Sequence, residues 1–145
     1  MQGRTHTTRL RVRFGETDAA GIVYYPTFFV WFDVATHGLL RAAIGELRGP
    51  DKRPQYPIPL VESGARFVAP VYYDDLIEIR STVVHVGRSS MRIEHVVTRD
   101  GAEAANGFEV RVVIAAGAGP IRSTRMPEEM RRALSEPVST SDDAP

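Results

Sequence analysis

The spacing of hydrophobic and polar residues changes character within the first third of the chain. Over residues 10–14 apolar positions alternate with arginines, which is typical of a half-buried strand. From Pro26 the alternation stops, and apolar residues continue to Ile44, just before Gly45. Proline suits the first position of a helix, because its φ is preset and its missing N–H would have no partner there. Since glycine commonly follows the last helical residue, the pattern predicts a helix over 26–44.

The predicted helix is apolar around most of its circumference. Only Asp33, His37 and Arg41, which follow one another at intervals of four residues, form a narrow polar stripe. A helix of this kind must be enclosed by other parts of the protein. No other segment has a long helical pattern, so we expect strands to enclose it.

The segments after the helix have the pattern of strands joined by turns. Val and Ile are concentrated in four long segments: 58–68, 76–86, 91–99 and 102–116. Turn-forming residues separate the segments at 70–75, 87–90 and 100–101, as in successive hairpins. We therefore predict an α+β fold in which a long buried helix is wrapped by a curved antiparallel sheet of about five strands. One strand would precede the helix, and a four-stranded meander would follow it.

The C-terminal part of the chain becomes polar. Residues 127–134 form a short amphipathic stretch that predicts a helical turn. Residues 136–145 offer little to bury, so we expect a disordered tail after a single domain over 1–135. Five strands cannot close around a helix, and the free edges of the sheet favour a homo-oligomer that continues it.

Composition and charge exclude several classes of function. Eighteen basic and eighteen acidic residues give a formal net charge of zero, which argues against nucleic acid as a partner. The absence of cysteine excludes disulfides, thiolate metal sites and cysteine nucleophiles. The four histidines lack metal-ligand spacing, so no metal is expected. Polar residues over 1–8 and the charges within 26–44 argue against a secretion signal and a membrane span, and we expect a cytoplasmic protein.

One local group of residues has catalytic potential. Asp18 stands in a loop of small residues shortly before the predicted helix. The first turn of a helix offers unpaired N–H groups and the positive end of the helix dipole, which together stabilise an anionic oxygen. A nearby carboxylate can attack a carbonyl carbon, or can deprotonate the water that does so. These are two parts of an acyl-transfer site. The alternative is that Asp18 only caps a turn or the helix through its side chain.

The same region is similar to a known family. Residues 11–26, which include the run Asp18-Ala-Ala-Gly-Ile-Val-Tyr-Tyr, together with residues 31–33, resemble the opening motif of the 4-hydroxybenzoyl-CoA thioesterase family of hotdog-fold enzymes. Weaker similarities follow at 72–75, 87–90 and 126–128. The resemblance covers about residues 9–134. The fold that it implies, a long helix wrapped by an antiparallel sheet, agrees with the hydrophobic pattern.

The resemblance implies roles for individual residues. Asp18 would be the catalytic carboxylate, acting as nucleophile toward the thioester or as general base on water, and Gly21 would keep the loop clear for the substrate. Tyr25 would offer its backbone N–H to the thioester oxygen, and the aromatic pair of Tyr24 and Tyr25 favours benzoyl-type substrates. The family binds CoA across a subunit interface, and the residues expected near its phosphates are Arg88, Ser89, Ser90, Arg122 and Arg125.

The sequence thus predicts an acyl-CoA thioesterase that releases a small acid, with benzoyl or hydroxybenzoyl groups favoured, and CoA, without a cofactor. It would work as a homodimer or as a tetramer of two dimers. Two alternatives remain open. A non-catalytic acyl-CoA-binding protein would share the fold. A hydroxyacyl-thioester dehydratase would need a histidine near Asp18, whereas His37 lies nearly three turns into the helix. Glu62 on the strand 58–68 could face a neighbour's site or be an ordinary exposed carboxylate.

Overall fold

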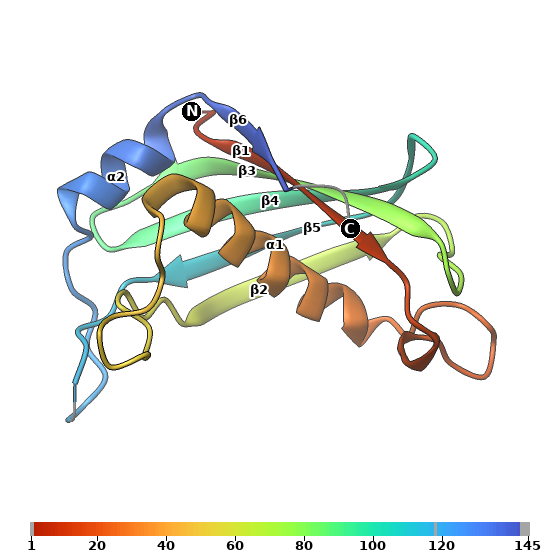
Figure 1. Cartoon of the computed structure of the whole chain (residues 1–145), viewed down its shortest axis with the longest axis horizontal. Helices are drawn as coiled ribbons and strands as arrows, with labels where there is room; N and C mark the ends of the chain where they lie inside the picture. The colour runs from red at the N-terminus through yellow and green to blue at the C-terminus, as the bar shows by residue number, and fades with distance from the viewer. Residues whose placement is uncertain (1, 118, 143–145) are drawn as a thin grey trace.

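One long helix lies across a curved sheet in the computed structural model, which describes residues 2–117 and 119–142 (Figure 1). In chain order the elements are β1 (Thr5–Arg11), the 3₁₀ turn η1 (Phe14–Glu16), α1 (Pro26–Ile44), β2 (Leu60–Phe67), β3 (Leu76–Val86), β4 (Ser90–Arg99), β5 (Ala102–Val112), α2 (Glu128–Ser135) and β6 (Ser139–Ser141). The bounds predicted for the helix over 26–44 and the strand over 76–86 are those observed. The α+β class is confirmed.

The order of the strands differs from the predicted meander. The sheet has six strands in the order β2-β5-β4-β3-β1-β6. Only β3, β4 and β5 follow one another as antiparallel hairpins, whereas β2 pairs with β5 and β1 pairs with β3. The predicted four-stranded meander is therefore wrong. Hydrophobic spacing identifies strands, but it carries no information about which strands become neighbours.

Several strand boundaries also differ from their predictions, among them those of β1, β2, β4 and β5. β1 begins at Thr5. The hydrophobic pattern does not predict its first half, because His6 and Thr8 are polar although they are buried. Phe14, expected in this strand, lies in η1 with 75% of its surface exposed. β5 ends at Val112 rather than at 116.

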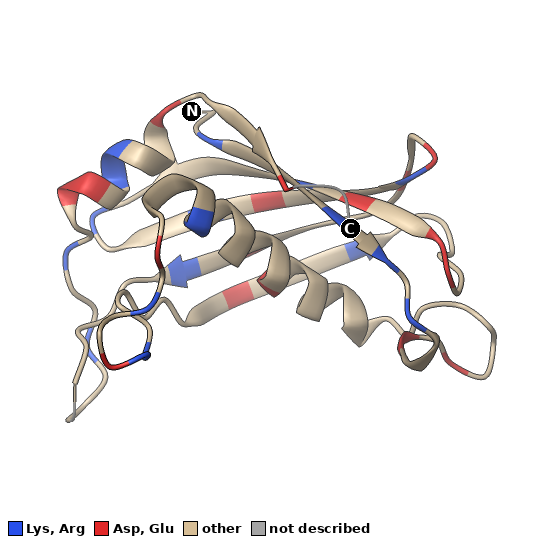
Figure 2. Ribbon diagram, in the orientation of Figure 1, with Lys and Arg blue, Asp and Glu red and all other residues tan. Residues whose placement is uncertain are grey.

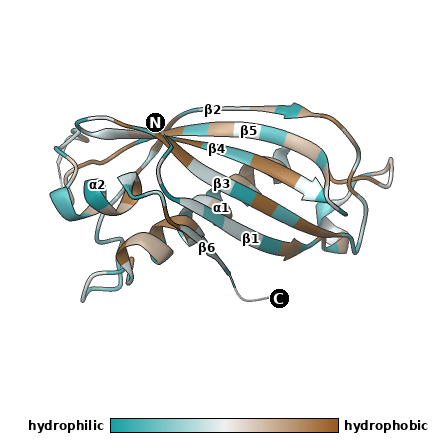
Figure 3. Ribbon diagram, turned by 90° about the horizontal axis from the view of Figure 1, so that it is seen from above, coloured by the Kyte–Doolittle hydropathy of each residue, from teal (hydrophilic) through white to brown (hydrophobic). Residues whose placement is uncertain are grey.

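The sheet encloses one side of α1. The buried hydrophobic side chains of the helix are Phe28, Trp31, Phe32, Ala35, Leu39 and Leu40. Val30 and Val34 are 58% and 43% exposed, so the expected enclosure all round is not found within one protomer. The physical reason is that a single sheet covers only one face of a helix. In the view from above, hydrophobic and hydrophilic residues mix along the strands and α1 lies behind them (Figure 3).

The C-terminal segment is ordered as far as the structure describes it. β6 pairs with β1 in parallel, which makes the sheet a mixed one. The ring nitrogens of His6 lie 2.7 Å from Thr140 Oγ1 and 2.8 Å from Asp142 Oδ1. The expectation of a disordered tail over 136–145 is therefore wrong up to Asp142, because strand pairing and a buried histidine replace the missing apolar contacts. Residues 143–145 lie outside the described part of the chain.

Candidate active site

A tight loop precedes α1 and carries Asp18. The Asp18 N–H donates to the Ile22 carbonyl at 2.9 Å, and the Tyr24 N–H donates to the Glu16 carbonyl at 2.9 Å, which closes the loop like a short hairpin. Gly21 has a φ of +80°, a left-handed conformation that glycine adopts without strain. A Cβ at Gly21 would meet no atom within 4 Å. The backbone conformation, rather than a lack of room within the protomer, therefore requires glycine here.

Asp18 is exposed, and one of its carboxylate oxygens accepts a hydrogen bond from its own loop. Oδ1 accepts the N–H of Ala20 at 2.8 Å, so the side chain caps its own loop, as the alternative interpretation of this residue holds. Oδ2 has no hydrogen-bond partner among the described residues. Capping and chemistry are therefore compatible, because one oxygen holds the loop and the other is free to meet a ligand.

The start of α1 presents an unpaired backbone donor. The Thr27 N–H donates to the Tyr24 carbonyl at 2.9 Å, and Pro26 has no N–H. The Phe28 N–H donates to the Tyr25 carbonyl at 3.1 Å. The Tyr25 N–H itself has no acceptor within residues 2–117 and 119–142. It stands at the positive end of the dipole of a helix of 19 residues, where an anionic oxygen is stabilised.

An apolar pocket of about 520 Å³ opens beside Tyr25. Its walls are Ile22, Val23, Tyr25, Phe28, Phe67, Val68, Ala69, Pro70 and Val71. The rings of Tyr25 and Phe28 pack edge-on against Phe67, with centroid separations of 6.1 and 5.2 Å. Neither Asp18 nor Tyr24 lines this pocket. Within one protomer the structure therefore brings Tyr25, but not Asp18, to the pocket wall.

A second pocket of about 460 Å³ lies at the other end of α1, against the loop that leads to β2. Its walls are mainly aliphatic and prolyl side chains, with Arg48, Lys52 and His37 also present. It contains no carboxylate. This pocket offers apolar volume without the groups that acyl transfer needs, so we place the candidate site at the first pocket.

The residues expected near CoA phosphates gather at the opposite end of the molecule from the Asp18 loop (Figures 1 and 2). They are Arg88, Arg122 and Arg125, which are exposed, and Ser89 and Ser90, which are half-buried. Backbone hydrogen bonds join the turn at 87–90 to the segments at 113 and 126. The Asp18 loop and this basic end are separated by the length of β3, whose 11 residues span roughly 36 Å. One protomer therefore does not bring these residues to Asp18.

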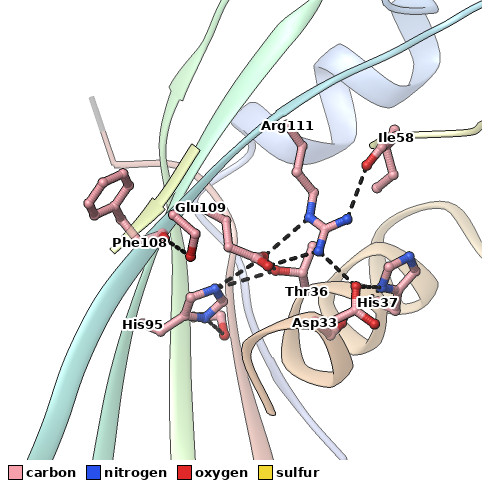
Figure 4. Close-up of polar contacts among 10 residues, drawn as sticks. Asp33, Thr36, His37, Ile58, His95, Phe108, Glu109 and Arg111 are labelled. Atoms are coloured by element: carbon pink, nitrogen blue, oxygen red, sulfur yellow. Dashed lines mark hydrogen bonds and ion pairs between the residues drawn. The ribbon is translucent and has the colours of Figure 1, made fainter. Parts of the chain in front are cut away.

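A buried polar network crosses the middle of α1 (Figure 4). At its centre is Glu109 on β5, which is 2% exposed. The Thr36 hydroxyl donates to Glu109 Oε1, and His95 Nε2 lies 3.4 Å from the same oxygen. Arg111 Nη2 donates to Glu109 Oε2 at 2.8 Å and to Asp33 Oδ1 at 2.7 Å. The network thus ties α1 to two strands of the sheet.

Hydrogen bonding decides the charge state of this network. Burial alone would raise the pKa of Glu109, but the hydrogen bonds from His95, Arg111 and Thr36 and the positive charge of Arg111 lower it to about 2. Burial alone would lower the pKa of Arg111, whereas its bonds to Glu109 and Asp33 raise it. Both groups therefore stay charged at neutral pH.

Sequence reasoning missed this network, although a signal for it was present. Glu109 and Arg111 are two residues apart on a predicted strand, so they share one face of it. The same face carries Gly107, where a Cβ would lie 2.5 Å from the Phe32 ring of α1. A charge pair next to a small residue on one strand face indicates burial under a helix. Glu62, the strand carboxylate considered from the sequence, is exposed on the outer strand β2.

The described residues contain neither a group of possible metal ligands nor a helix that could span a membrane. No three His, Asp or Glu side chains in that part of the chain are grouped so that they could hold a metal ion. Neither of its helices combines the length and the apolar character needed to cross a membrane. The cytoplasmic location expected from the sequence stays a prediction.

Comparison with known sequences points to one family. The family model of the thioesterase-like superfamily matches residues 12–134. The 4-hydroxybenzoyl-CoA thioesterase of Pseudomonas sp. (strain CBS-3) is 31% identical over 98 residues, which cover 66% of this chain and 70% of that protein. The 1,4-dihydroxy-2-naphthoyl-CoA hydrolase of Synechococcus sp. (strain WH7803) is 28% identical over 131 residues, which cover 86% of this chain and 84% of that protein.

Solved structures are similar over most of the chain. A 4-hydroxybenzoyl-CoA thioesterase variant in complex with 4-hydroxybenzoyl-CoA has a TM-score of 0.83 at 25% identity, covering 91% of this chain and 99% of that one. A gentisyl-coenzyme A thioesterase has a TM-score of 0.77 at 33% identity, covering 88% of this chain and 98% of that one.

Proposed function

Because the chain belongs to the thioesterase-like superfamily, we propose that it hydrolyses an aromatic acyl-CoA to the free acid and CoA. The family resemblance and the hotdog fold that it implied are confirmed by the family match and by the solved structures. The enzyme class is thioester hydrolase, since the relatives are named as thioesterases and hydrolases of CoA esters. The aromatic walls of the pocket beside Tyr25 support a benzoyl- or hydroxybenzoyl-type acyl group.

The observation that carries this proposal is the free N–H of Tyr25 at the mouth of an apolar pocket. A thioester carbonyl placed against this N–H would accept its hydrogen bond. When the carbonyl carbon is attacked, negative charge develops on the oxygen, and a preformed donor at the positive end of a helix stabilises that charge. The donor needs no rearrangement, because α1 already holds it in place.

Asp18 supplies the second group. As a general base, its carboxylate would take a proton from water while the water oxygen bonds to the carbonyl carbon, and the proton would pass to the CoA sulfur as the C–S bond breaks. As a nucleophile, the carboxylate would itself bond to that carbon, and the C–S bond would break to release CoA as its thiolate. Water would then open the resulting anhydride, which gives the free acid and restores the Asp18 carboxylate. Oδ2, which has no partner within the described ranges, is the oxygen available for either role.

A second copy of the chain would complete the site. β2 is the outer strand of the sheet beside the pocket, and Leu60, Val61 and Phe67 on it are between 46% and 63% exposed. An unpaired edge with exposed apolar residues favours pairing with an identical edge. In a two-fold pair the strands run antiparallel, so the Leu60 end of one copy would lie beside the Phe67 end of the other. A dimer suffices for this arrangement, and a tetramer of two dimers would preserve it.

This pairing would also explain the distant arginines. The Leu60 end of β2 lies near the basic end of the protomer. Just before β2, the Pro59 carbonyl accepts the Val112 N–H at 3.2 Å. Three residues after Val112, the Ala115 N–H donates to the Arg122 carbonyl at 3.1 Å. A CoA whose thioester lies at Tyr25 would therefore extend toward the basic end of the second copy. Arginine suits this contact, because its guanidinium binds phosphate through paired hydrogen bonds.

The test is a panel of CoA esters assayed with Asp18→Asn and a matched control. Benzoyl-, hydroxybenzoyl-, phenylacetyl- and short aliphatic CoA esters are compared by thiol release. We expect the wild type to prefer the benzoyl types and Asp18→Asn to lose on the order of 10³-fold in kcat. Asp51→Asn is the control, because Asp51 Oδ1 also accepts an N–H two residues on, from Arg53 at 3.0 Å. It should retain full activity.

The outcome of this panel also decides between the alternatives. A wild type that binds acyl-CoA without hydrolysing any ester would favour the non-catalytic binding protein. Full activity in Asp18→Asn would remove Asp18 from the mechanism. Loss of water from a hydroxyacyl ester would favour the dehydratase, but no histidine lies in the Asp18 loop, and His37 Nδ1 lies 2.8 Å from the Asp33 carbonyl within α1.

A further inference from the structure

One carboxylate close to the Asp18 loop has no part in the proposed chemistry. Glu16 ends the η1 turn two residues before Asp18, and its side chain is only 10% exposed. It does not line the pocket beside Tyr25. It lies instead between the loop and α1, in contact with both.

Glu16 is bonded to three surrounding pieces of the chain. Its Oε2 accepts the indole N–H of Trp31 on α1 at 2.9 Å. Its backbone carbonyl accepts the Tyr24 N–H at 2.9 Å, on the far side of the loop. Its Oε1 accepts the Arg13 N–H at 2.7 Å, and the Arg13 guanidinium donates to Oε2 at 3.2 Å. A single residue thus joins the chain before Asp18, the residue before Tyr25, and the helix.

The contact between Glu16 and Trp31 is specific in its chemistry. Trp31 is 3% exposed, and a buried indole N–H without an acceptor is destabilising. Burial would raise the pKa of Glu16, but hydrogen bonds from the Arg13 backbone, the Arg13 side chain and Trp31 lower it overall. The acceptor is therefore an ionised carboxylate, which makes the stronger kind of hydrogen bond.

Trp31 extends this connection to the pocket. Its ring packs edge-on against Phe28, with centroids 5.0 Å apart, and Phe28 lines the pocket beside Tyr25. The loop that carries Asp18 and the wall of the pocket are therefore joined through one hydrogen bond and one aromatic contact.

We propose that Glu16 is a positioning residue, which holds the Asp18 loop against α1 so that the Asp18 carboxylate and the Tyr25 N–H meet the same thioester carbonyl. The inference rests on the proposed function, because it assumes that Asp18 and Tyr25 act on one bond. Misplacing reacting groups by about 1 Å lowers a rate on the order of 10²-fold. Binding of CoA would change little, because its phosphates would be held by the basic end of a second copy, which Glu16 does not contact.

The experiment compares Glu16→Gln and Trp31→Phe with a matched control in the full-length protein. Glu16→Gln keeps an acceptor oxygen but removes the charge, and Trp31→Phe keeps the ring but removes the donor. We expect either change to lower kcat by about 10- to 100-fold and to change KM by less than about threefold. The double variant should be no slower than the slower single one, because both changes act on the same hydrogen bond, one by removing the charge of its acceptor and the other by removing its donor. Glu46→Gln is the control, since Glu46 accepts the Arg48 N–H at 3.1 Å in a different loop, and its kcat should match the wild type.

A spectroscopic measurement separates positioning from general stability. Trp31 is the only tryptophan of the chain, so its fluorescence reports this contact directly. The emission maximum should shift in Glu16→Gln at temperatures where the variant is fully folded, and it should stay unchanged in Glu46→Gln. A lower unfolding temperature of Glu16→Gln with unchanged kcat would overturn the positioning role.

Failure of this inference can be distinguished from failure of the proposed function. An active wild type with an inactive Asp18→Asn and an unaffected Glu16→Gln would preserve the function and overturn the positioning role. If the wild type hydrolyses no ester, the proposed function has failed. Amide hydrogen exchange then tests separately whether Glu16 holds the Asp18 loop in place. Faster exchange of the Asp18 and Tyr24 amides in Glu16→Gln would support the role of Glu16 in holding the Asp18 loop against α1, and equal exchange would overturn it.

Discussion

Two carboxylates near α1 have opposite surroundings. Asp18, in the loop before the helix, is exposed and accepts one hydrogen bond from its own loop. Glu109, under the middle of the helix, is 2% exposed and is held by Thr36, His95 and Arg111. The pKa of Glu109 is lowered to about 2 by these partners. The carboxylate whose pKa is strongly lowered is therefore the one farther from the candidate chemistry.

The comparison teaches what a perturbed pKa means in this fold. Strongly shifted groups mark active sites in many proteins, but structural ion-pair networks shift them as well. Glu109 lines neither pocket, and every contact described for its carboxylate is with a neighbouring side chain of the protein. A group that must meet a substrate needs an open position, which Asp18 has. Accessibility in the loop that leads into α1, rather than a shifted pKa, is the reason why Asp18 is the candidate.

The largest expected effect that tests this comparison is on stability. Arg111→Ala should lower the free energy of unfolding by about 3–5 kcal/mol, because it leaves Glu109 buried without its positive partner. Asp18→Asn should change the same quantity by less than about 0.5 kcal/mol. Urea unfolding measures both. Arg80→Ala, an exposed arginine on β3, is the control. Equal losses in Arg111→Ala and Arg80→Ala would mean that the network contributes no stability.

A somewhat smaller effect should appear in the pH dependence of stability. The pKa of Glu109 in the folded protein is about 2, below the ordinary value of 4.5 for a glutamate. Its contribution is therefore fully present above about pH 5 and is lost as the pH falls toward 2. The unfolding free energies of the wild type and Glu109→Gln should differ most above about pH 5. The difference between them should become smaller by roughly 3 kcal/mol as the pH falls from 5 to 2. A gap that stays constant with pH would contradict the assignment.

The smallest expected effect concerns the basic end of the molecule. Arg122→Ala should raise KM for CoA esters by about three- to tenfold, because one exposed phosphate contact contributes about 1 kcal/mol. It should leave KM for N-acetylcysteamine thioesters unchanged, since these lack the nucleotide. The same Arg80→Ala variant serves as the control. Equal changes in KM for both kinds of ester would show that Arg122 is an ordinary surface arginine.

Local parts of the fold were predictable from the sequence. The bounds of α1 followed from Pro26, Gly45 and the apolar run between them, because each signal acts on its own neighbours. The loop glycine and the donor at Tyr25 belong to the same short stretch, so a motif in the sequence could locate both. The turn role of Asp18 was also foreseen as one of two interpretations, and the structure has it together with a free Oδ2 within the described ranges.

Distant contacts were not predictable in this way. Arg111 and Asp33 are 78 residues apart in the chain, yet their side chains are 2.7 Å apart. β2 follows α1 in the sequence, but it pairs with β5, which lies much further along the chain. The ring of His6 contacts Thr140 and Asp142 in a C-terminal segment whose polar composition predicted disorder.

By itself, the sequence determined the bounds of α1, the positions of the long strands and the family, because hydrophobic period, turn chemistry and motif spacing are properties of neighbouring residues. Only the tertiary structure decided which strands are neighbours, which charges are buried, and that Glu16 reaches Trp31. These depend on packing α1 against the whole sheet, and packing joins residues whose separation along the chain carries no signal.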